Sequence, residues 1–128
     1  MSPTELVQRA DAICRTEQGA FNRIQAHPPP NASIAADQTG QLLRATERAN
    51  SDLRDLSPPD ALKAPYDRYL EARDRVVDQM KRGQEAAEKQ DSSDYSAAQA
   101  AVAHEAPERR KLARAVGLKV CSASSAST

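Results

Sequence analysis

The amino-acid sequence predicts an all-α protein that folds as an up-down-up-down four-helix bundle. Apolar residues recur three, four or seven positions apart along four segments, and this spacing is typical of one face of a helix. Polar or proline-rich stretches separate the segments, and none shows the alternation of a strand. Short connections place consecutive helices side by side and antiparallel. The 128 residues suffice for one domain, which we expect over residues 1–122, followed by a disordered tail at 123–128.

The first helix is predicted from Pro3 to about Ala26. Ser2 can cap it, Pro3 suits the first helical position, and Glu5 completes a capping box. The row of apolar positions along a helix is called its seam below. In this helix the seam holds Leu6, Ala10, Ile13, Ala20 and Ile24. The prolines at 28–30 end the helix, because proline removes a hydrogen-bond donor and disfavours helix in the residue before it.

The second helix is predicted to begin at a cap formed by Asn31 or Ser33 and to end before the prolines at 58–59. Its seam holds Ala35, Leu42, Thr46, Ala49, Leu53 and Leu56.

In the third helix, Pro65 predicts a short helical lead-in at 59–64, followed by a kink or a restart. The seam of that helix holds Leu62, Tyr66, Tyr69, Arg73, Val76, Met80 and Ala87.

A fourth helix is predicted after the capping sequence at 91–94, with a bend at Pro107. Its seam holds Tyr95, Ala98, Val102, Leu112 and Val116. Gly117 suits the left-handed conformation that closes a helix, and Leu118 suits the hydrophobic contact that accompanies it. The sequence therefore predicts a sharp end to this helix at Gly117.

The composition argues against several classes of partner. There are 18 basic and 18 acidic residues, and this balance argues against nucleic-acid binding. No apolar run approaches the roughly 18 residues that a membrane span needs. Acidic residues often precede basic ones by four positions, as Asp11 precedes Arg15, which indicates solvated helix faces. Because the seams are narrow and leave no large apolar patch, we expect a monomer.

Charged residues at seam positions are the candidate site residues. They are Glu17, Arg73, Glu105 and Arg109. In one interpretation they reach solvent at the ends of the bundle or pair with one another. In the other they form a polar pocket that binds a small ligand, and its buried carboxylates would be candidate acid–base groups. The sequence alone leaves both interpretations open.

The sequence offers few residues that could bind a metal ion or a haem. His27 and His104 are the two histidines, and neither has the Glu-x-x-His spacing of a di-iron site in a helical bundle. Neither cysteine belongs to a Cys-x-x-Cys-His run, which excludes covalent haem. Met80 with His104 could hold a b-type haem, although bulky apolar pocket residues are scarce. We therefore predict no metal and no cofactor, with a haem-binding bundle as an alternative.

Four short motifs together resemble a group of small bacterial proteins. ADAICR at 10–15, PPP at 28–30, LSPPDAL at 56–62 and AVGLKVC at 115–121 follow one another as in helical domains of secreted proteins and lipoproteins from actinobacteria and related high-GC bacteria. The similarity covers almost all of residues 1–122. It implies a disulfide and an extracytoplasmic location, but it implies no reaction.

Cys14 and Cys121 are the two cysteines, and the resemblance implies that they pair. Bundle geometry agrees, because the end of the fourth helix lies beside the start of the first in an alternating bundle. Cys14 lies roughly 16 Å along the first helix, and residues 117–121 can span that distance in extended form. Two separate thiols are the alternative.

The expected function is that of a non-enzymatic binding or structural module of unknown ligand. We expect it to be secreted, or anchored by a lipid upstream of residue 1, with an unknown protein or cell-envelope partner. The first alternative is a small-ligand or haem-binding bundle. The second is an enzyme that uses the seam carboxylates.

Overall fold

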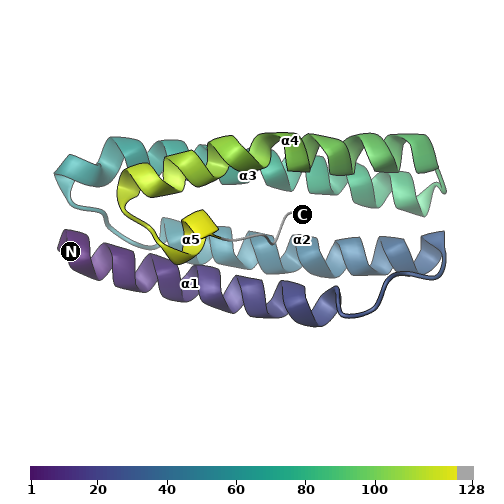
Figure 1. The fold of residues 1–128 in the computed structure, drawn as a ribbon, viewed down its shortest axis with the longest axis horizontal. Coiled ribbons are helices and arrows are strands. Elements are labelled where there is room, and N and C mark those ends of the chain that lie inside the picture. Colours follow the sequence, from purple (N-terminus) through teal and green to yellow (C-terminus); the bar gives the residue numbers. More distant parts are fainter. Residues whose placement is uncertain (124–128) are drawn as a thin grey trace.

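The computed structural model describes residues 1–123, which form four long helices and one short helix (Figure 1). They are α1 (Pro3–Ile24), α2 (Ala32–Arg54), α3 (Asp60–Glu88), α4 (Ser92–Val116) and α5 (Val120–Ala123). This part of the chain contains no strand, so the predicted all-α bundle is confirmed. Of the predicted tail at 123–128, Ala123 belongs to α5, and residues 124–128 lie outside the described residues.

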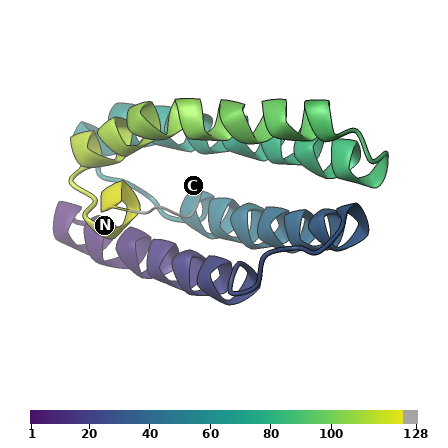
Figure 2. The same cartoon turned by 45° about the vertical axis from the view of Figure 1, so that its right-hand side comes forward.

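The four long helices alternate in direction and lie in two layers (Figures 1 and 2). α1 lies beside α2 in one layer, and α4 lies along α3 in the other. α2 and α3 pack against each other across the layers, whereas α1 and α4 meet only weakly within residues 1–123. The short α5 contacts both α1 and α4. It therefore connects α4 to the middle part of α1 (Figure 1).

Side-chain caps begin three of the helices. The Ser2 hydroxyl oxygen accepts a hydrogen bond from the Glu5 amide at 3.1 Å, as the sequence predicts. Asn31, and not Ser33, caps α2 through a bond from the Ile34 amide. Asp91 caps α4 in the same way. Each cap accepts from an amide at the helix start that has no partner within its own helix.

Two of the predicted element boundaries need correction. α1 ends at Ile24, two residues before the predicted end, with Gln25 as its C-terminal cap. α3 runs without interruption through Pro65, so the predicted restart is wrong. α4 also continues through Pro107, where a bend and not an end was predicted. Proline removes only one helical hydrogen bond, and packing of the flanking apolar residues, such as Tyr66 directly after Pro65, offsets that loss.

Two clusters of buried apolar residues fill the bundle. The first includes Leu6, Ala10, Cys14, Leu53, Tyr66, Tyr69, Leu70, Ala113, Val116, Leu118 and Cys121. The second includes Phe21, Leu43, Val76, Val77, Met80 and Val102. Between the clusters, along the first three helices, lie the buried polar side chains of Glu17, Asn50 and Arg73. This interruption of the core positions the candidate site.

Gly117 closes α4 in the left-handed conformation, with φ of 96°. The Leu118 amide donates to the Ala113 carbonyl at 3.1 Å, which completes the predicted end of the helix.

A side chain at this φ strains the backbone, so we expect Gly117→Ala to lower the free energy of unfolding by about 1–2 kcal/mol. Urea denaturation measures the change.

Gly19 is the matched control, because it lies inside α1 and a Cβ there would meet only the end of the Arg23 side chain, at 3.5 Å. Gly19→Ala is expected to leave the stability unchanged or raise it by up to about 1 kcal/mol. Equal effects of the two substitutions would contradict the assignment of strain to Gly117.

Candidate functional site

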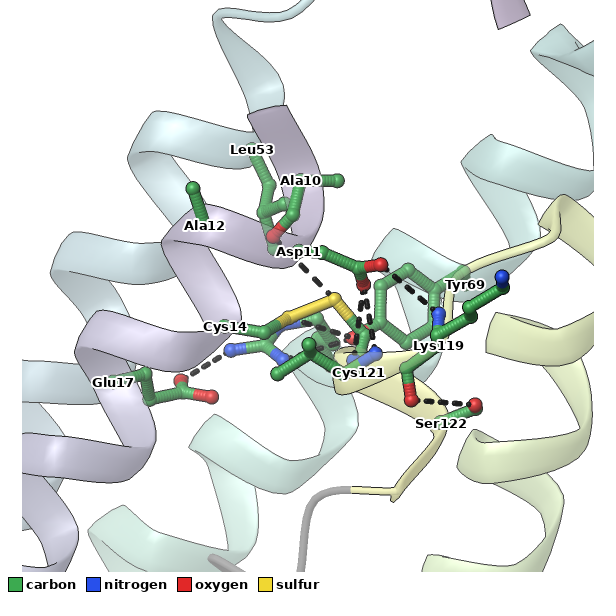
Figure 3. Close-up of a disulfide and its surroundings, with 12 residues drawn as sticks. Ala10, Asp11, Ala12, Cys14, Glu17, Leu53, Tyr69, Lys119, Cys121 and Ser122 are labelled. Atoms are coloured by element: carbon green, nitrogen blue, oxygen red, sulfur yellow. Dashed lines mark hydrogen bonds and ion pairs between the residues drawn. A yellow bond between two sulfur atoms is a disulfide. The ribbon is translucent and has the colours of Figure 1, made fainter. Parts of the chain in front are cut away.

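A disulfide joins Cys14 of α1 to Cys121 of α5, with 5.3 Å between the two Cα atoms (Figure 3). Both residues are buried within the first apolar cluster. The predicted pairing of the two cysteines is confirmed. The predicted extended return of residues 117–121 is wrong, because the chain forms α5 immediately after Lys119.

Asp11 explains why the chain turns into α5 at this point. Its buried carboxylate accepts hydrogen bonds from the backbone amides of Lys119 at 3.1 Å, Val120 at 3.0 Å and Cys121 at 3.3 Å (Figure 3). These amides lie at the start of a helix, where they have no carbonyl partner of their own. The prediction that Asp11 belongs to a solvated face with Arg15 is therefore wrong. Its partners lie about 110 residues further along the chain.

Removing the Asp11 carboxylate should loosen the attachment of α5. We expect Asp11→Ala to lower the free energy of unfolding by about 1.5–3 kcal/mol, because hydrogen bonds to a charged acceptor are lost and buried amides lose their partner. Asp11→Asn, which keeps an acceptor but not the charge, should have a smaller effect. Urea denaturation of the oxidised protein measures both.

Asp37→Ala provides the control, because Asp37 is an exposed acidic residue of α2. Its effect should lie within about 0.5 kcal/mol of zero. An equally small effect of Asp11→Ala would show that the disulfide alone holds α5 in place.

Arg73 of α3 and Glu17 of α1 form a buried ion pair. The guanidinium also donates from Nε to Asn50 Oδ1 at 2.6 Å and from Nη1 to the Tyr69 hydroxyl at 3.0 Å. Its Cζ lies 5.7 Å from the centre of the Tyr69 ring. The charge is thus surrounded by partners from three helices, which is the condition under which a buried ion pair is tolerated.

The pKa values of the two buried arginines of the site are shifted in opposite directions. Burial lowers the pKa of Arg73, but Tyr69 and Glu17 outweigh this effect and raise the pKa above its ordinary value. The pKa of Arg109 is lowered by its burial and by the nearby charge of Arg73. The site therefore contains two guanidinium groups close enough to repel each other.

The ion pair is also connected to the disulfide. The hydroxyl of Tyr69, which binds Arg73, lies 3.7 Å from Cys14 Sγ. Figure 3 shows Glu17 one turn along α1 from Cys14. The disulfide and the buried charged residues thus form one continuous set of contacts.

A cavity of about 450 Å³ adjoins these charged residues. Its charged lining residues are Glu17, Arg73 and Arg109. Its apolar lining comprises Phe21, Leu42, Val76, Met80, Gly83, Ala98, Ala100, Val102 and Ala103. The neutral polar lining residues are Gln25, Thr39, Thr46, Tyr95 and Gln99. Several of the α4 residues that line the cavity are alanines, and their side chains are too short to fill the space toward α1.

The structure places the predicted site residues in different surroundings. Glu17, Arg73 and Arg109 line the same cavity. Glu105 does not line it and instead lies 3.9 Å from Arg75 of α3, measured between Oε1 and Nε. The sequence could not distinguish these positions, because all four occupy inward-facing seams.

The two predicted haem ligands are not brought together. Met80 lines the cavity, but His104 is exposed on α4 and does not line it. His27 is exposed in the turn between α1 and α2. Within residues 1–123, no three side chains of His, Cys, Asp or Glu gather where they could hold a metal ion.

Two residues of the site were not singled out by the sequence. Asn50 accepts a hydrogen bond from Arg73. It directly follows the seam residue Ala49, so a polar residue beside a seam was the feature of the sequence that could have identified it. Tyr69 was predicted only as a seam residue of the third helix, and its buried hydroxyl accepts a hydrogen bond from Arg73.

No protein-family model, curated protein or solved structure matches this chain. Among the helices described for residues 1–123, none is both long and apolar enough to cross a membrane.

Proposed function

We propose that this protein is a non-enzymatic binding module that works outside the cytoplasm and takes a small, largely apolar ligand into the cavity. The cavity itself carries the proposal. Its volume of about 450 Å³ falls within the usual range of small-molecule sites, roughly 300–1,000 Å³. Its mostly apolar lining with a few convergent polar groups is also typical of such sites.

A bundle with a purely structural role would gain nothing from an unfilled cavity. Cavities in a protein interior lower stability, because the lining side chains lose packing partners. This protein has a core built largely from alanine, valine and leucine, so filling the space with larger side chains would be a direct route to higher stability. A function in ligand binding would explain why the cavity is not filled by larger side chains.

The contacts of the carboxylates favour binding over catalysis. Glu17 is held in the ion pair with Arg73, which keeps it from acting as a free base. No histidine lines the cavity within the described residues. The arrangement resembles an orienting polar group in a binding site more than an acid–base pair.

The disulfide supports a location outside the cytoplasm, because disulfides persist in oxidising compartments and are rare where thiols are kept reduced. The module would be released from the cell or tethered to the cell envelope.

The surface supports a monomer. Among the described residues, the exposed large hydrophobic side chains are those of Met1 and Ile34, each 37% exposed. They do not make the large apolar patch that marks a stable interface. Sedimentation at micromolar concentration is expected to give a mass of 13.9 kDa, and a mass twice as large would contradict the expectation.

Binding of a neutral apolar dye tests the proposed cavity. N-phenyl-1-naphthylamine becomes fluorescent in apolar surroundings, and we expect it to bind the wild-type protein saturably. Ala103 is exposed and lines the cavity, so Ala103→Trp should obstruct the entrance without disturbing the core. Ala115 is an exposed alanine of the same helix that does not line the cavity, and Ala115→Trp is the matched control.

The expected result is weaker dye binding by Ala103→Trp and unchanged binding by Ala115→Trp. No saturable binding by the wild-type protein, or equal binding by both variants, would overturn the proposal. Circular dichroism of each variant confirms that the helices are retained.

A further inference from the structure

We infer that the cavity takes a single-chain aliphatic amphiphile tail-first, with the end of the apolar chain at the ion pair of Glu17 and Arg73 and the polar head left at the surface. The inference rests on the proposed function and specifies the class and the orientation of its ligand. It follows from the shape of the cavity, from the hydrogen bonds at one of its ends and from the exposure of the other.

The cavity runs along the bundle, from the ion pair toward the connection between α1 and α2. In the alternating bundle, the end of α1, the start of α2, the end of α3 and the start of α4 lie together at one end (Figure 1). The lining residues of the four helices that lie furthest in this direction are Gln25, Thr39, Gly83 and Tyr95. All four helices therefore follow the cavity over part of their length.

The cavity is longer than it is wide. On α3 its lining extends from Arg73 to Gly83, or roughly 15 Å at 1.5 Å per residue. A volume of about 450 Å³ distributed over that length leaves a width well below the length. This shape suits an extended chain better than a broad ring system.

The end of the cavity at the ion pair is closed. Glu17 and Arg73 are 6% and 5% exposed. About one turn further along α1 and α3 lie Cys14 and Tyr69 of the first apolar cluster, which are 1% and 0% exposed. The disulfide and α5 hold this part of the bundle together (Figure 3). A chain that enters the cavity therefore ends at the ion pair.

The polar groups near the closed end already have partners within the protein. Arg73 is bonded to residues from three helices, and Arg109 has a partner as well. The Thr46 hydroxyl donates within its own helix, to the Leu42 carbonyl at 3.0 Å. Within residues 1–123, the only fully buried polar side-chain atom without a hydrogen-bond partner is Oε2 of Glu105, which does not line the cavity. A polar group on the inner end of a ligand would therefore lose its bonds to water without replacement.

The opposite end of the cavity is open to solvent and carries uncharged polar side chains. Gln25 and Gln99 are exposed there, and Tyr95 is half-buried. The Tyr95 hydroxyl accepts a hydrogen bond from Gln99 Nε2 at 2.7 Å. Along α4 the lining stays exposed as far as Ala103, the position chosen above to obstruct the entrance. A polar head placed at this end keeps its water, whereas the chain is buried.

Two isomeric diols test the orientation. 1,2-Decanediol carries both hydroxyls at one end of its chain, whereas 1,10-decanediol carries one at each end. Each competes with bound N-phenyl-1-naphthylamine below its aggregation concentration. We expect 1,2-decanediol to displace the dye at a concentration at least about tenfold lower, because 1,10-decanediol must bury a hydroxyl at the closed end without a hydrogen bond.

Chain length tests the position of the closed end. For 1-alkanols from hexanol to dodecanol, affinity for the wild-type protein should rise about three- to fourfold per methylene until the chain reaches the ion pair. Val76 lines the cavity about one turn from Arg73, so Val76→Phe should end this rise at a shorter chain. Val7→Phe makes the same change at a valine of α1 that does not line the cavity, and this matched control should behave as wild type.

The outcomes separate this inference from the proposed function. Equal affinities of the two diols for a wild-type protein that binds the dye would overturn the tail-first orientation and leave the binding function standing. A rise that ends at the same chain length in Val76→Phe and in the wild-type protein would overturn the closed end at the ion pair. If circular dichroism shows that Val76→Phe does not fold, the two diols on the wild-type protein decide the inference. Absence of binding by the dye and by all the alcohols would overturn the proposed function itself.

Discussion

Replacement of both cysteines by alanine is expected to lower the free energy of unfolding by about 4.7 kcal/mol, the chain-entropy value for a closed loop of roughly 100 residues. The bridge between Cys14 and Cys121 spans a sequence separation of 107 residues. It therefore restricts nearly the whole unfolded chain. Typical single domains are stable by only roughly 5–15 kcal/mol, so the loss should remove a large share of the stability.

Urea denaturation of the oxidised protein, with and without reductant, measures this effect. The reductant should shift the unfolding midpoint of the wild-type protein and leave that of Cys14→Ala/Cys121→Ala unchanged, which controls for other actions of the reductant. A midpoint that is the same for the oxidised and reduced wild-type protein would show that the bridge does not restrict the unfolded state.

Breaking the buried ion pair from one side is expected to have the second large effect. Glu17→Leu leaves the Arg73 guanidinium buried without its carboxylate, and loss of one partner of a buried pair costs about 3–5 kcal/mol. Arg73→Met should be comparably destabilising, since it also removes the donors to Asn50 and Tyr69. The double variant should be much less destabilised than the sum of the single ones, because it leaves no unpaired charge.

A double-mutant cycle by urea denaturation checks this expectation, and the exposed pair of Arg54 and Asp74 provides the comparison. Those side chains are 47% and 49% exposed, so the same cycle there should give a coupling of no more than about 1 kcal/mol. Similar coupling energies for the two pairs would mean that burial does not distinguish them.

The features that sequence alone determined are local. The Ser2 cap, a cap within 91–94 and the left-handed Gly117 were predicted correctly because each depends on residues within one turn of the helix end. The four long helices followed from the apolar spacing for the same reason. The pairing of Cys14 with Cys121 was predicted because the resemblance implied a disulfide and because an alternating bundle brings the end of its last helix to its first.

The features that only the tertiary structure decided depend on contacts between distant segments. Asp11 looked like a surface residue paired with Arg15, but it binds amides of α5, about 110 residues away. The seam charges presented the same difficulty, because periodicity shows which face of a helix points inward but not which neighbour each inward residue meets. Rotation and sliding of packed helices place Glu17 against Arg73 and turn Glu105 toward Arg75. The cavity likewise arises from the weak contact between α1 and α4, which is a property of the assembled bundle and of no single segment.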